Sequence, residues 1–206
     1  MIGKSVQDID TPTLVIDLDA MKRNLGRMAE FAKKHHVRWR PHAKLHKSVL
    51  LAKMQVKAGA VGVCVQKTSE AEIMVAGGVH DVYISNEVIA PAKLARVAAL
   101  TQAVAAQGGQ IAIAVDSLEG VSRLVRAMTH ARTGARNDTP KAATVIDVFV
   151  EIDVGQGRCG VQPGPDAVLL ALEIRKHPAL RFAGLQAYHG KAQHLRSVQE
   201  RRTATA

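Results

Sequence analysis

The sequence predicts an α/β fold, a (β/α)8 barrel of the TIM type that is incomplete within this chain. Short β-branched runs alternate with longer amphipathic stretches, which is the pattern of a parallel sheet with helical crossovers. No GxGxxG motif follows the first run, so a dinucleotide-binding doubly wound sheet is disfavoured. Polar or ionisable residues recur where the runs end, and barrel enzymes place their chemistry at the rim formed by strand carboxyl ends.

The predicted strands are short runs rich in Val, Ile and other strand-forming residues. They span residues 12–18, 37–41, 61–66, 81–85, 110–116, 145–153 and 181–190. The polar side chains at or just after their ends are Lys44, Gln66 with Lys67, Asn86, Asp116, Asp153 and His189. Because the carboxyl ends of parallel strands meet at one rim, we expect these side chains to surround a common site.

The predicted helices lie between these runs, at 20–35, 48–59, 69–78, 91–100, 117–128 and 165–176. We expect Asp19 to cap the first helix. The apolar face of that helix, at spacings of three and four, would consist of Met21, Leu25, Met28 and Phe31 or Ala32. The second helix is expected to begin at Ser48 and to end at Gly59. The polar segment 130–143 is predicted to be a surface loop.

Composition and cysteine usage exclude several classes of protein. The 206 residues are 47% hydrophobic, which is enough for a sizeable core. No apolar run reaches the roughly 18–20 residues of a membrane span, and the N-terminus lacks a signal-peptide pattern, so we expect a cytoplasmic protein without a membrane partner. Cys64 and Cys159 lie far apart with no zinc-type spacing around them, so reduced thiols are expected.

The formal charge of +10 raises the question of a nucleic-acid partner. Lys and Arg are scattered along the chain, and aromatic residues make up only 3% of it. Nucleic-acid-binding domains usually cluster their cations and often add aromatic stacking platforms. We therefore expect no nucleic-acid partner, and an anionic small molecule explains a local basic cluster equally well.

The segment RWRPHAKLHKS, residues 38–48, concentrates positive charge around Lys44. Nearby cations and partial desolvation make an amine more nucleophilic, so a lysine at the end of a barrel strand is a candidate Schiff-base lysine. A solvated basic turn is the competing interpretation of the same residues. Lys47 is expected to pair with an acidic neighbour and to support Lys44.

Five segments occur in an order that resembles a known enzyme group. They are DTPTLVIDLDAMKRNL, RPHAKLHK, ISNEV, VEIDVGQGRCG, and GLQAYHG with QHLR. From about Asp10 to Arg202 the chain is similar to the D-threonine aldolase and D-serine dehydratase group of pyridoxal 5′-phosphate (PLP) enzymes. The resemblance implies a barrel of the alanine racemase N-terminal type, the fold type III of PLP enzymes.

The resemblance assigns two catalytic residues. Lys44 is the first lysine of the family's PHxKxHK motif and would carry PLP as a Schiff base. Leu45 beside it departs from the Thr or Ala that the family often has, which leaves Lys44 itself intact. His194, in AQHLR, resembles the histidine that takes the proton from the substrate's β-hydroxyl group in the aldolases.

The resemblance also assigns cofactor-binding residues. Arg158 would hydrogen-bond the phenolic oxygen of PLP, which suits a guanidinium because it keeps its charge. His189 would lie against the pyridine ring, and Tyr188 and Gln66 would line the pocket. The glycine before Arg158 indicates a place where a ligand approaches the backbone closely.

The implied activity is a PLP-dependent aldolase that cleaves D-β-hydroxy amino acids, such as D-threonine, to glycine and an aldehyde. His194 would act through water bound to a divalent metal, Mn or a similar ion. A D-serine dehydratase-type ammonia-lyase, in which Lys44 removes the Cα proton, and an amino-acid racemase are alternatives on the same fold. A noncatalytic PLP-binding barrel protein and a basic binding module are two further, non-enzymatic alternatives.

The strand count predicts that the barrel is completed by residues beyond this chain. If 12–18 lies outside the barrel, six strands follow, whereas a closed barrel needs eight. We expect residues 1–20 to pair with a C-terminal β-domain and residues 21–206 to form a partial PLP-binding barrel. The phosphate cradle and the metal ligands are expected in that further region, and the complete enzyme is expected to be a homodimer. The open sheet edge predicts that the 206-residue chain alone folds poorly and turns over little or no substrate.

Overall fold

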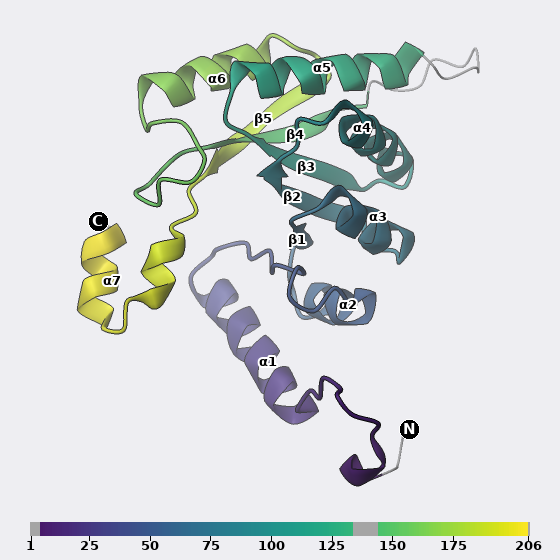
Figure 1. Cartoon of the computed structure of the whole chain (residues 1–206), viewed down its shortest axis with the longest axis vertical. Coiled ribbons are helices and arrows are strands. Elements are labelled where there is room, and N and C mark those ends of the chain that lie inside the picture. The colour runs from purple at the N-terminus through teal and green to yellow at the C-terminus, as the bar shows by residue number, and fades with distance from the viewer. Residues whose placement is uncertain (1–4, 134–143, 206) are drawn as a thin grey trace.

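The sheet of the protein is parallel and follows the chain in order. The computed structural model describes residues 5–133 and 144–205. The strands are β1 Val63–Val65, β2 Asp81–Glu87, β3 Gln110–Val115, β4 Ile146–Glu151 and β5 Leu180–Gln186, in the spatial order β1-β2-β3-β4-β5 (Figure 1). A doubly wound sheet would reverse this order at a switch point, whereas a barrel does not. The observed order confirms the predicted barrel-type α/β fold.

Helices connect the strands and cover one face of the sheet. The helical segments are η1 Val6–Asp8, α1 Leu18–Lys34, α2 Val49–Lys57, α3 Thr68–Ala76, α4 Pro91–Ala105, α5 Leu118–Thr133, α6 Pro165–Arg175, η2 Gly190–His194 and α7 Val198–Thr205. Helices α3, α4 and α6 contact the strands, and α5 packs between α4 and α6 (Figure 1). Within 5–133 and 144–205, no helix combines the length and the apolar character needed to cross a membrane.

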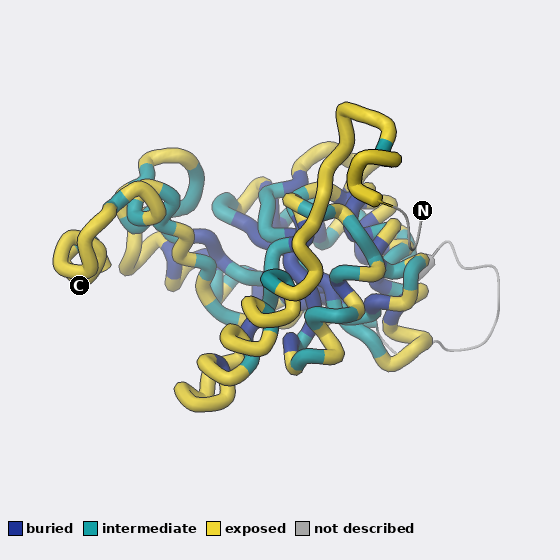
Figure 2. The backbone as a smooth tube through the Cα atoms, turned by 90° about the horizontal axis from the view of Figure 1, so that it is seen from below, coloured by how far each residue is buried: buried dark blue, intermediate teal, exposed yellow. Residues whose placement is uncertain are grey.

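The main core lies between the sheet and these helices. The strands contribute mainly β-branched residues, among them Val82, Ile84, Ile111, Ile113, Val115, Ile146, Val148 and Val150, and the helices contribute Met74, Leu94, Leu124, Leu170 and Ile174. Successive side chains of a strand point to opposite faces, so every second strand residue enters this layer. Figure 2 shows the buried backbone concentrated here, whereas the N-terminal segment and α7 are exposed.

The opposite face of the same strands is polar. Its side chains include Tyr83, Ser85 and Glu87 from β2, and Asp147, Phe149 and Glu151 from β4. The rings of Tyr83 and Phe149 lie 4.8 Å apart between centroids. Asp147 forms an ion pair with Arg181 of β5. We call this side of the sheet the concave face and the helix-covered side the convex face.

Two predicted strands are not strands in the structure. Residues 12–17 carry no strand and lead into α1, which begins at Leu18, and Leu14 is 88% exposed. Residues 37–41 run beside β1, since the Cys64 amide donates to the Pro41 carbonyl at 2.8 Å and an isolated bridge joins His42 to Cys64. Pro41 has no N–H group to continue a ladder, which explains why this stretch is only bridged. The described barrel therefore has five strands and one bridged segment instead of six strands.

The first helix begins earlier and packs differently than predicted. Asp17, not Asp19, is its N-cap, because the Asp17 carboxylate accepts the Ala20 amide at 2.8 Å. Met28 is 40% and Phe31 is 53% exposed, so these two residues do not belong to its packed face. The predicted Leu25 and Ala32 do pack, and Ala29 joins them in a small second core with Ala58, Ala60 and Trp39.

The remaining helix predictions agree with the structure apart from their lengths. Ser48 caps α2 by accepting the Leu51 amide, and Gly59 follows its end with φ +111°, as expected for a glycine that ends a helix. Helices α4 and α5 run about a turn further than predicted, to Ala105 and Thr133. Most of the predicted loop, 134–143, lies outside the described residues.

Candidate active site

A cavity opens at the carboxyl ends of the strands on the concave face. Its volume is about 420 Å³. It is lined by Arg40, His42, Lys44, Cys64, Gln66, Tyr83, Ser85, Phe149, Arg158, Gln186, Ala187 and Tyr188. Four of the predicted site residues are among them, namely Lys44, Gln66, Arg158 and Tyr188. The structure thus brings together residues that lie more than a hundred positions apart in the sequence.

A larger groove, of about 870 Å³, lies between α4 and α5. Its walls include Leu94, Ala99 and Ala127, and it opens on the helical side of the sheet. Barrel enzymes place their chemistry at the carboxyl ends of the strands and not between the outer helices. The smaller cavity is therefore the candidate active site.

Lys44 lies at the rim because it directly follows the segment that is bridged to β1 through His42 and Cys64. The Ala43 amide donates to the Cys64 carbonyl at 2.7 Å, which ties the segment to β1 just before Lys44. The Lys44 side chain is exposed toward the cavity that it lines. Among the residues that the structure describes, no salt bridge involves Lys44. Its amine is therefore available to a ligand.

His42 supports this loop as a neutral imidazole. Its Nδ1 atom accepts the Lys44 amide at 3.3 Å, and its Nε2 atom lies 3.3 Å from Gln66 Oε1 and 3.4 Å from Ser85 Oγ. Burial and then the Lys44 charge lower the pKa of His42. An Nδ1 acceptor leaves the proton on Nε2, where it can be donated to Gln66. The sequence pattern suggested only a flanking cation at this position, although a histidine two residues before Lys44 was a usable signal.

Lys47 is held away from the cavity by an acidic neighbour. Its ammonium lies 3.6 Å from Glu70, which confirms the predicted pairing. Glu70 also accepts the amides of Gln66 at 2.9 Å and Lys67 at 3.2 Å at the start of α3. The Glu70 carboxylate therefore fixes the turn that carries Gln66. It also pairs with the Lys47 ammonium, so Lys44 and not Lys47 offers its amine to a ligand in the cavity.

Arg158 lies in a tight loop that follows β4. Asp153 accepts the Gly155 amide at 2.9 Å and the Gly157 amide at 3.0 Å. The hydrogen bonds from Gly157 and then Gly155 lower the pKa of Asp153. Gly157 has φ +69°, and a methyl group added to its Cα would meet no atom within 4 Å. The positive φ requires a glycine for this turn, and the close approach of a ligand at this position stays a prediction.

The Arg158 guanidinium lies against Tyr188. Its Cζ atom is 5.3 Å from the centroid of the Tyr188 ring, within the range of a cation–π contact. The loop after β4 is also tied to the loop after β5, since the Gly190 amide donates to Gln156 at 2.7 Å. The two loops therefore position Arg158 and Tyr188 jointly.

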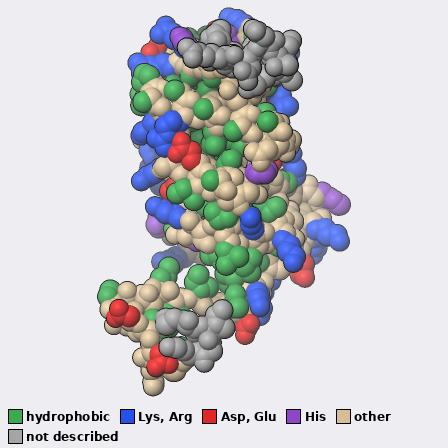
Figure 3. All heavy atoms as spheres, turned by 90° about the vertical axis from the view of Figure 1, so that its right-hand side faces the viewer, with side chains coloured by type: hydrophobic (Ala, Val, Ile, Leu, Met, Phe, Trp, Pro, Cys, Tyr) green, Lys and Arg blue, Asp and Glu red, His purple; other side chains and the backbone are tan. Residues whose placement is uncertain are grey.

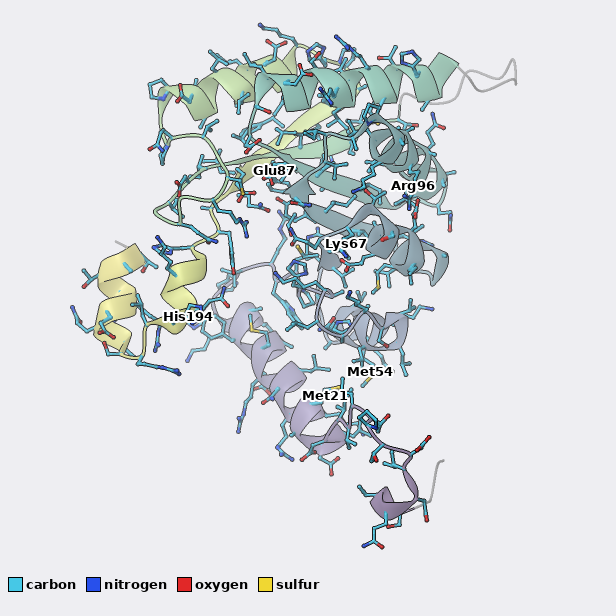
Figure 4. All side chains as sticks on the ribbon, viewed as in Figure 1. Met21, Met54, Lys67, Glu87, Arg96 and His194 are labelled. Carbon is cyan, nitrogen blue, oxygen red and sulfur yellow. The ribbon has the colours of Figure 1, made fainter. Side chains whose placement is uncertain are left out.

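The two predicted site histidines do not line the cavity. His189 is half-buried, and its Nδ1 atom has no hydrogen-bond partner among the described residues. His194 is exposed at the end of η2. Figure 4 shows it well apart from Glu87 at the end of β2. Both assignments stay predictions.

Behind Arg158 lies a chain of buried hydrogen bonds that was not predicted from the sequence. Tyr83 donates to Gln186, and Gln186 donates to Glu151. The Glu151 side chain is only 4% exposed and lies 3.5 Å from Arg158. Burial is the main cause that raises the pKa of Tyr83. The polar side of the alternation in VIDVFVEID, with acidic residues at 147, 151 and 153, was the signal that could have revealed this network.

A comparison with protein families identifies the family of the chain. The family model described as "Alanine racemase, N-terminal domain" matches residues 16–205. The chain belongs to this alanine racemase N-terminal domain family. The family match includes Lys44, Gln66, Arg158 and Tyr188, and its barrel-type fold agrees with the consecutive parallel strands seen here.

Within the family, the chain is similar to aldolases. It is 45% identical to a D-threonine aldolase of Arthrobacter sp. over 97% of this chain and 48% of the relative, and 40% identical to a 3-hydroxy-D-aspartate aldolase of Paracoccus denitrificans over the same shares. The crystal structure of D-threonine aldolase from Filomicrobium marinum superposes with a TM-score of 0.86 at 44% identity, over 97% of this chain and 49% of that one. The chain spans about half the length of the curated relatives that it matches.

Proposed function

We propose that this chain is part of a PLP-dependent lyase, an aldolase that cleaves D-β-hydroxy amino acids such as D-threonine to glycine and an aldehyde. The observation that carries the proposal is the Lys44 amine, which lines the rim cavity without a salt bridge to any described residue. Neutral His42 stands on one side of it, and Arg158 lines the same cavity. The similarity to two named aldolases supports the reaction class.

The residues of the cavity fit PLP. A volume of about 420 Å³ lies within the range of roughly 300–1,000 Å³ that small-molecule sites occupy. Lys44 offers an amine to the aldehyde, and Arg158 offers a permanent positive charge to the phenolic oxygen. His189 does not line this cavity, and its proposed place against the pyridine ring rests on the family resemblance.

Bound PLP supplies the electron sink that stabilises the carbanion left by Cα–Cβ cleavage. In the proposed site the Lys44 amine would hold the cofactor covalently through its aldehyde. Arg158, held against Tyr188, would orient the cofactor and donate a hydrogen bond to its phenolic oxygen. Gln66 and His42 fix the loop that carries Lys44. His194 is the proposed base for the substrate's β-hydroxyl proton.

The remaining parts of the proposal concern the surroundings of the enzyme. We propose that a divalent metal, Mn²⁺ or a similar ion, assists His194, and no described residue is assigned as its ligand. A cytoplasmic homodimer with residues 1–20 against a C-terminal β-domain remains our expectation. Lys and Arg side chains are spread over the face seen in Figure 3, which supports a small-molecule D-amino acid, and not nucleic acid, as the partner.

Product analysis tests the reaction class. PLP and D-threonine are added to the purified chain and to the same residues fused to the second half of the Arthrobacter relative. We expect glycine and acetaldehyde in equal amounts from the fusion. Ammonia and a 2-oxo acid would indicate a dehydratase instead, and L-allo-threonine, the product of inversion at Cα without cleavage, would indicate a racemase. A fusion that folds, shows a PLP absorption band and forms none of these products would support the noncatalytic PLP-binding alternative.

A further inference from the structure

Two carboxyl groups meet at the end of the concave face. Glu87 ends β2 and Glu151 ends β4, and their oxygens lie with Cys159 Sγ within a cluster 4.8 Å across. Two carboxyl groups this close in a partly desolvated place strongly disfavour a second negative charge at neutral pH. One proton must therefore be shared by the pair, and the surroundings decide which residue carries it.

The surroundings assign the negative charge to Glu151. One of its oxygens accepts Gln186, and the other accepts Cys159 Sγ at 3.2 Å and lies 3.5 Å from Arg158. Burial by itself raises the pKa of Glu151, but hydrogen bonds from Glu87, Cys159 and Gln186 and the charge of Arg158 outweigh it and lower that pKa. Glu151 is thus a buried carboxylate whose oxygens are both hydrogen-bonded.

The same surroundings leave the proton on Glu87. Its Oε1 atom is buried without a partner among the described residues. Burial and then Glu151 raise the pKa of Glu87 to about 8. The titratable or charged groups that face the pair are Tyr83 from β2, Asp116 at the end of β3, and Arg158 and Cys159 from the loop after β4. Only Arg158 among them is a cation.

We propose that Glu151 is a positioning residue for Arg158, and that Glu87 carries the proton that lets the two carboxyl groups lie side by side. The guanidinium is held from two sides, by Glu151 and by the ring of Tyr188. Its Nε atom also donates to Cys159 Sγ at 3.3 Å. The sharing of one proton between Glu87 and Glu151 does not depend on PLP. The effect of Glu151 on the cofactor, through Arg158, rests on the proposed function.

The Cys159 thiol reports the state of this cluster without any cofactor. It donates to Glu151 and accepts from Arg158. Burial is the main cause that raises its pKa to about 11. Alkylation by iodoacetamide requires the thiolate, and peptide mapping separates Cys159 from Cys64. The alkylation rate as a function of pH therefore measures the charges around the thiol.

The first test uses E151Q and its control D147N, which removes a buried carboxylate of the same strand and the same face. We expect E151Q to speed alkylation of Cys159 about three- to tenfold at pH 8, because the thiolate loses a neighbouring negative charge. D147N should leave the rate unchanged. Equal rates in E151Q and the original chain would overturn the assignment of the charge to Glu151.

The second test couples E151Q to R158Q in a double-mutant cycle. If Glu151 positions Arg158, we expect R158Q to slow alkylation at least threefold in the original chain and to have less effect when Glu151 is already replaced. Equal effects of R158Q in both backgrounds would contradict a positioning role.

The third test uses the variant E87Q. It should raise the alkylation rate of Cys159 above about pH 8 and leave that rate unchanged at pH 6.5, because only the ionised Glu87 opposes the thiolate. An E87Q profile parallel to that of the original chain would refute the shared proton.

The visible absorption of bound PLP is a further measurement, independent of the three alkylation tests. With PLP bound, E151Q should move the pH at which the visible absorption changes, and D147N should not. Absence of a PLP band in both the chain and its fusion to the second half of the Arthrobacter relative would refute the proposed function and leave the alkylation results to decide the carboxyl pair. A PLP band that is the same in E151Q and the original chain would refute the link from Glu151 through Arg158 to the cofactor.

Discussion

On the convex face of the sheet, β3 contributes Ile111, Ile113 and Val115, each no more than 4% exposed. On the concave face, β4 contributes Asp147 and Glu151, which are buried to a similar degree. The first set needs only apolar neighbours of fitting shape, whereas each member of the second needs a hydrogen bond or a counterion. The convex face therefore holds the fold together, and the concave face can carry charge to the rim where Lys44 lies.

The largest expected effect comes from the convex face. Leu124 of α5 is 1% exposed in the core, so Leu124→Ala should lower the free energy of unfolding by about 2–5 kcal/mol. Leu172→Ala, on an exposed position of α6 (54%), should cost less than about 0.5 kcal/mol. Urea unfolding followed by circular dichroism measures both. Equal losses in the two variants would mean that the convex layer is not the main core.

A smaller effect is expected from the ion pair of the concave face. Arg181→Gln leaves the buried Asp147 carboxylate without its counterion. Because Arg181 is itself 61% exposed, water screens the pair, and we expect a loss of about 1–2 kcal/mol. Arg123→Gln removes an exposed pair with Glu119 and a hydrogen bond to the Ile89 carbonyl and should cost clearly less than Arg181→Gln. A loss in Arg181→Gln that does not exceed that of the control would show that Asp147 is solvated.

The carboxyl pair makes stability depend on pH. The pKa of Glu87 is raised from 4.5 to about 8 on folding, so between these values the folded chain holds a proton that the unfolded chain has lost. Stability from this residue therefore falls as the pH rises from about 4.5 to about 8. Glu87→Gln should raise the melting temperature by about 3–6 °C at pH 8.5 and by little at pH 4.5. The increase is smaller than the full pKa shift implies, because Glu87 is only partly buried and water screens its charge. A constant difference across this range would contradict the raised pKa.

The smallest expected effect is that of a single hydroxyl group on the concave face. Tyr83→Phe removes the donor to Gln186 and should cost about 0.5–1.5 kcal/mol. Tyr188→Phe, whose hydroxyl accepts Gln193 on the surface, should cost close to nothing. Thermal unfolding of the two variants at one pH is sufficient. Equal costs would show that the Tyr83 hydrogen bond is replaced by water.

The sequence was most informative where one physical requirement acted alone. The β-branched alternation of the strands and the cap at Ser48 depend on local properties, and both were predicted correctly. Residues 37–41 have strand composition, but Pro41 interrupts the ladder, so composition alone was misleading there. In α1 the cap went to Asp17 because its carboxylate reaches the Ala20 amide, a choice between two aspartates that the pattern could not make.

The candidate site was predicted in part, for a similar reason. Lys44, Gln66, Arg158 and Tyr188 stand at strand ends or in the loops after them, and the topology brings these together. The network from Tyr83 to Glu151 depends on which strand faces which across the sheet, a tertiary fact that no local pattern contains. The resemblance to a known family, and not residue spacing, supplied the roles of His189 and His194.

The central claim is that the rim of the concave face is a PLP site built on Lys44. The most direct measurement is borohydride reduction of the chain with PLP, followed by peptide mapping of the labelled lysine. We expect the label on Lys44, its loss in Lys44→Ala, and its retention in Lys47→Ala, because Lys47 is paired with Glu70. Label spread over surface lysines in all three proteins, or concentrated on Lys47, would contradict the claim.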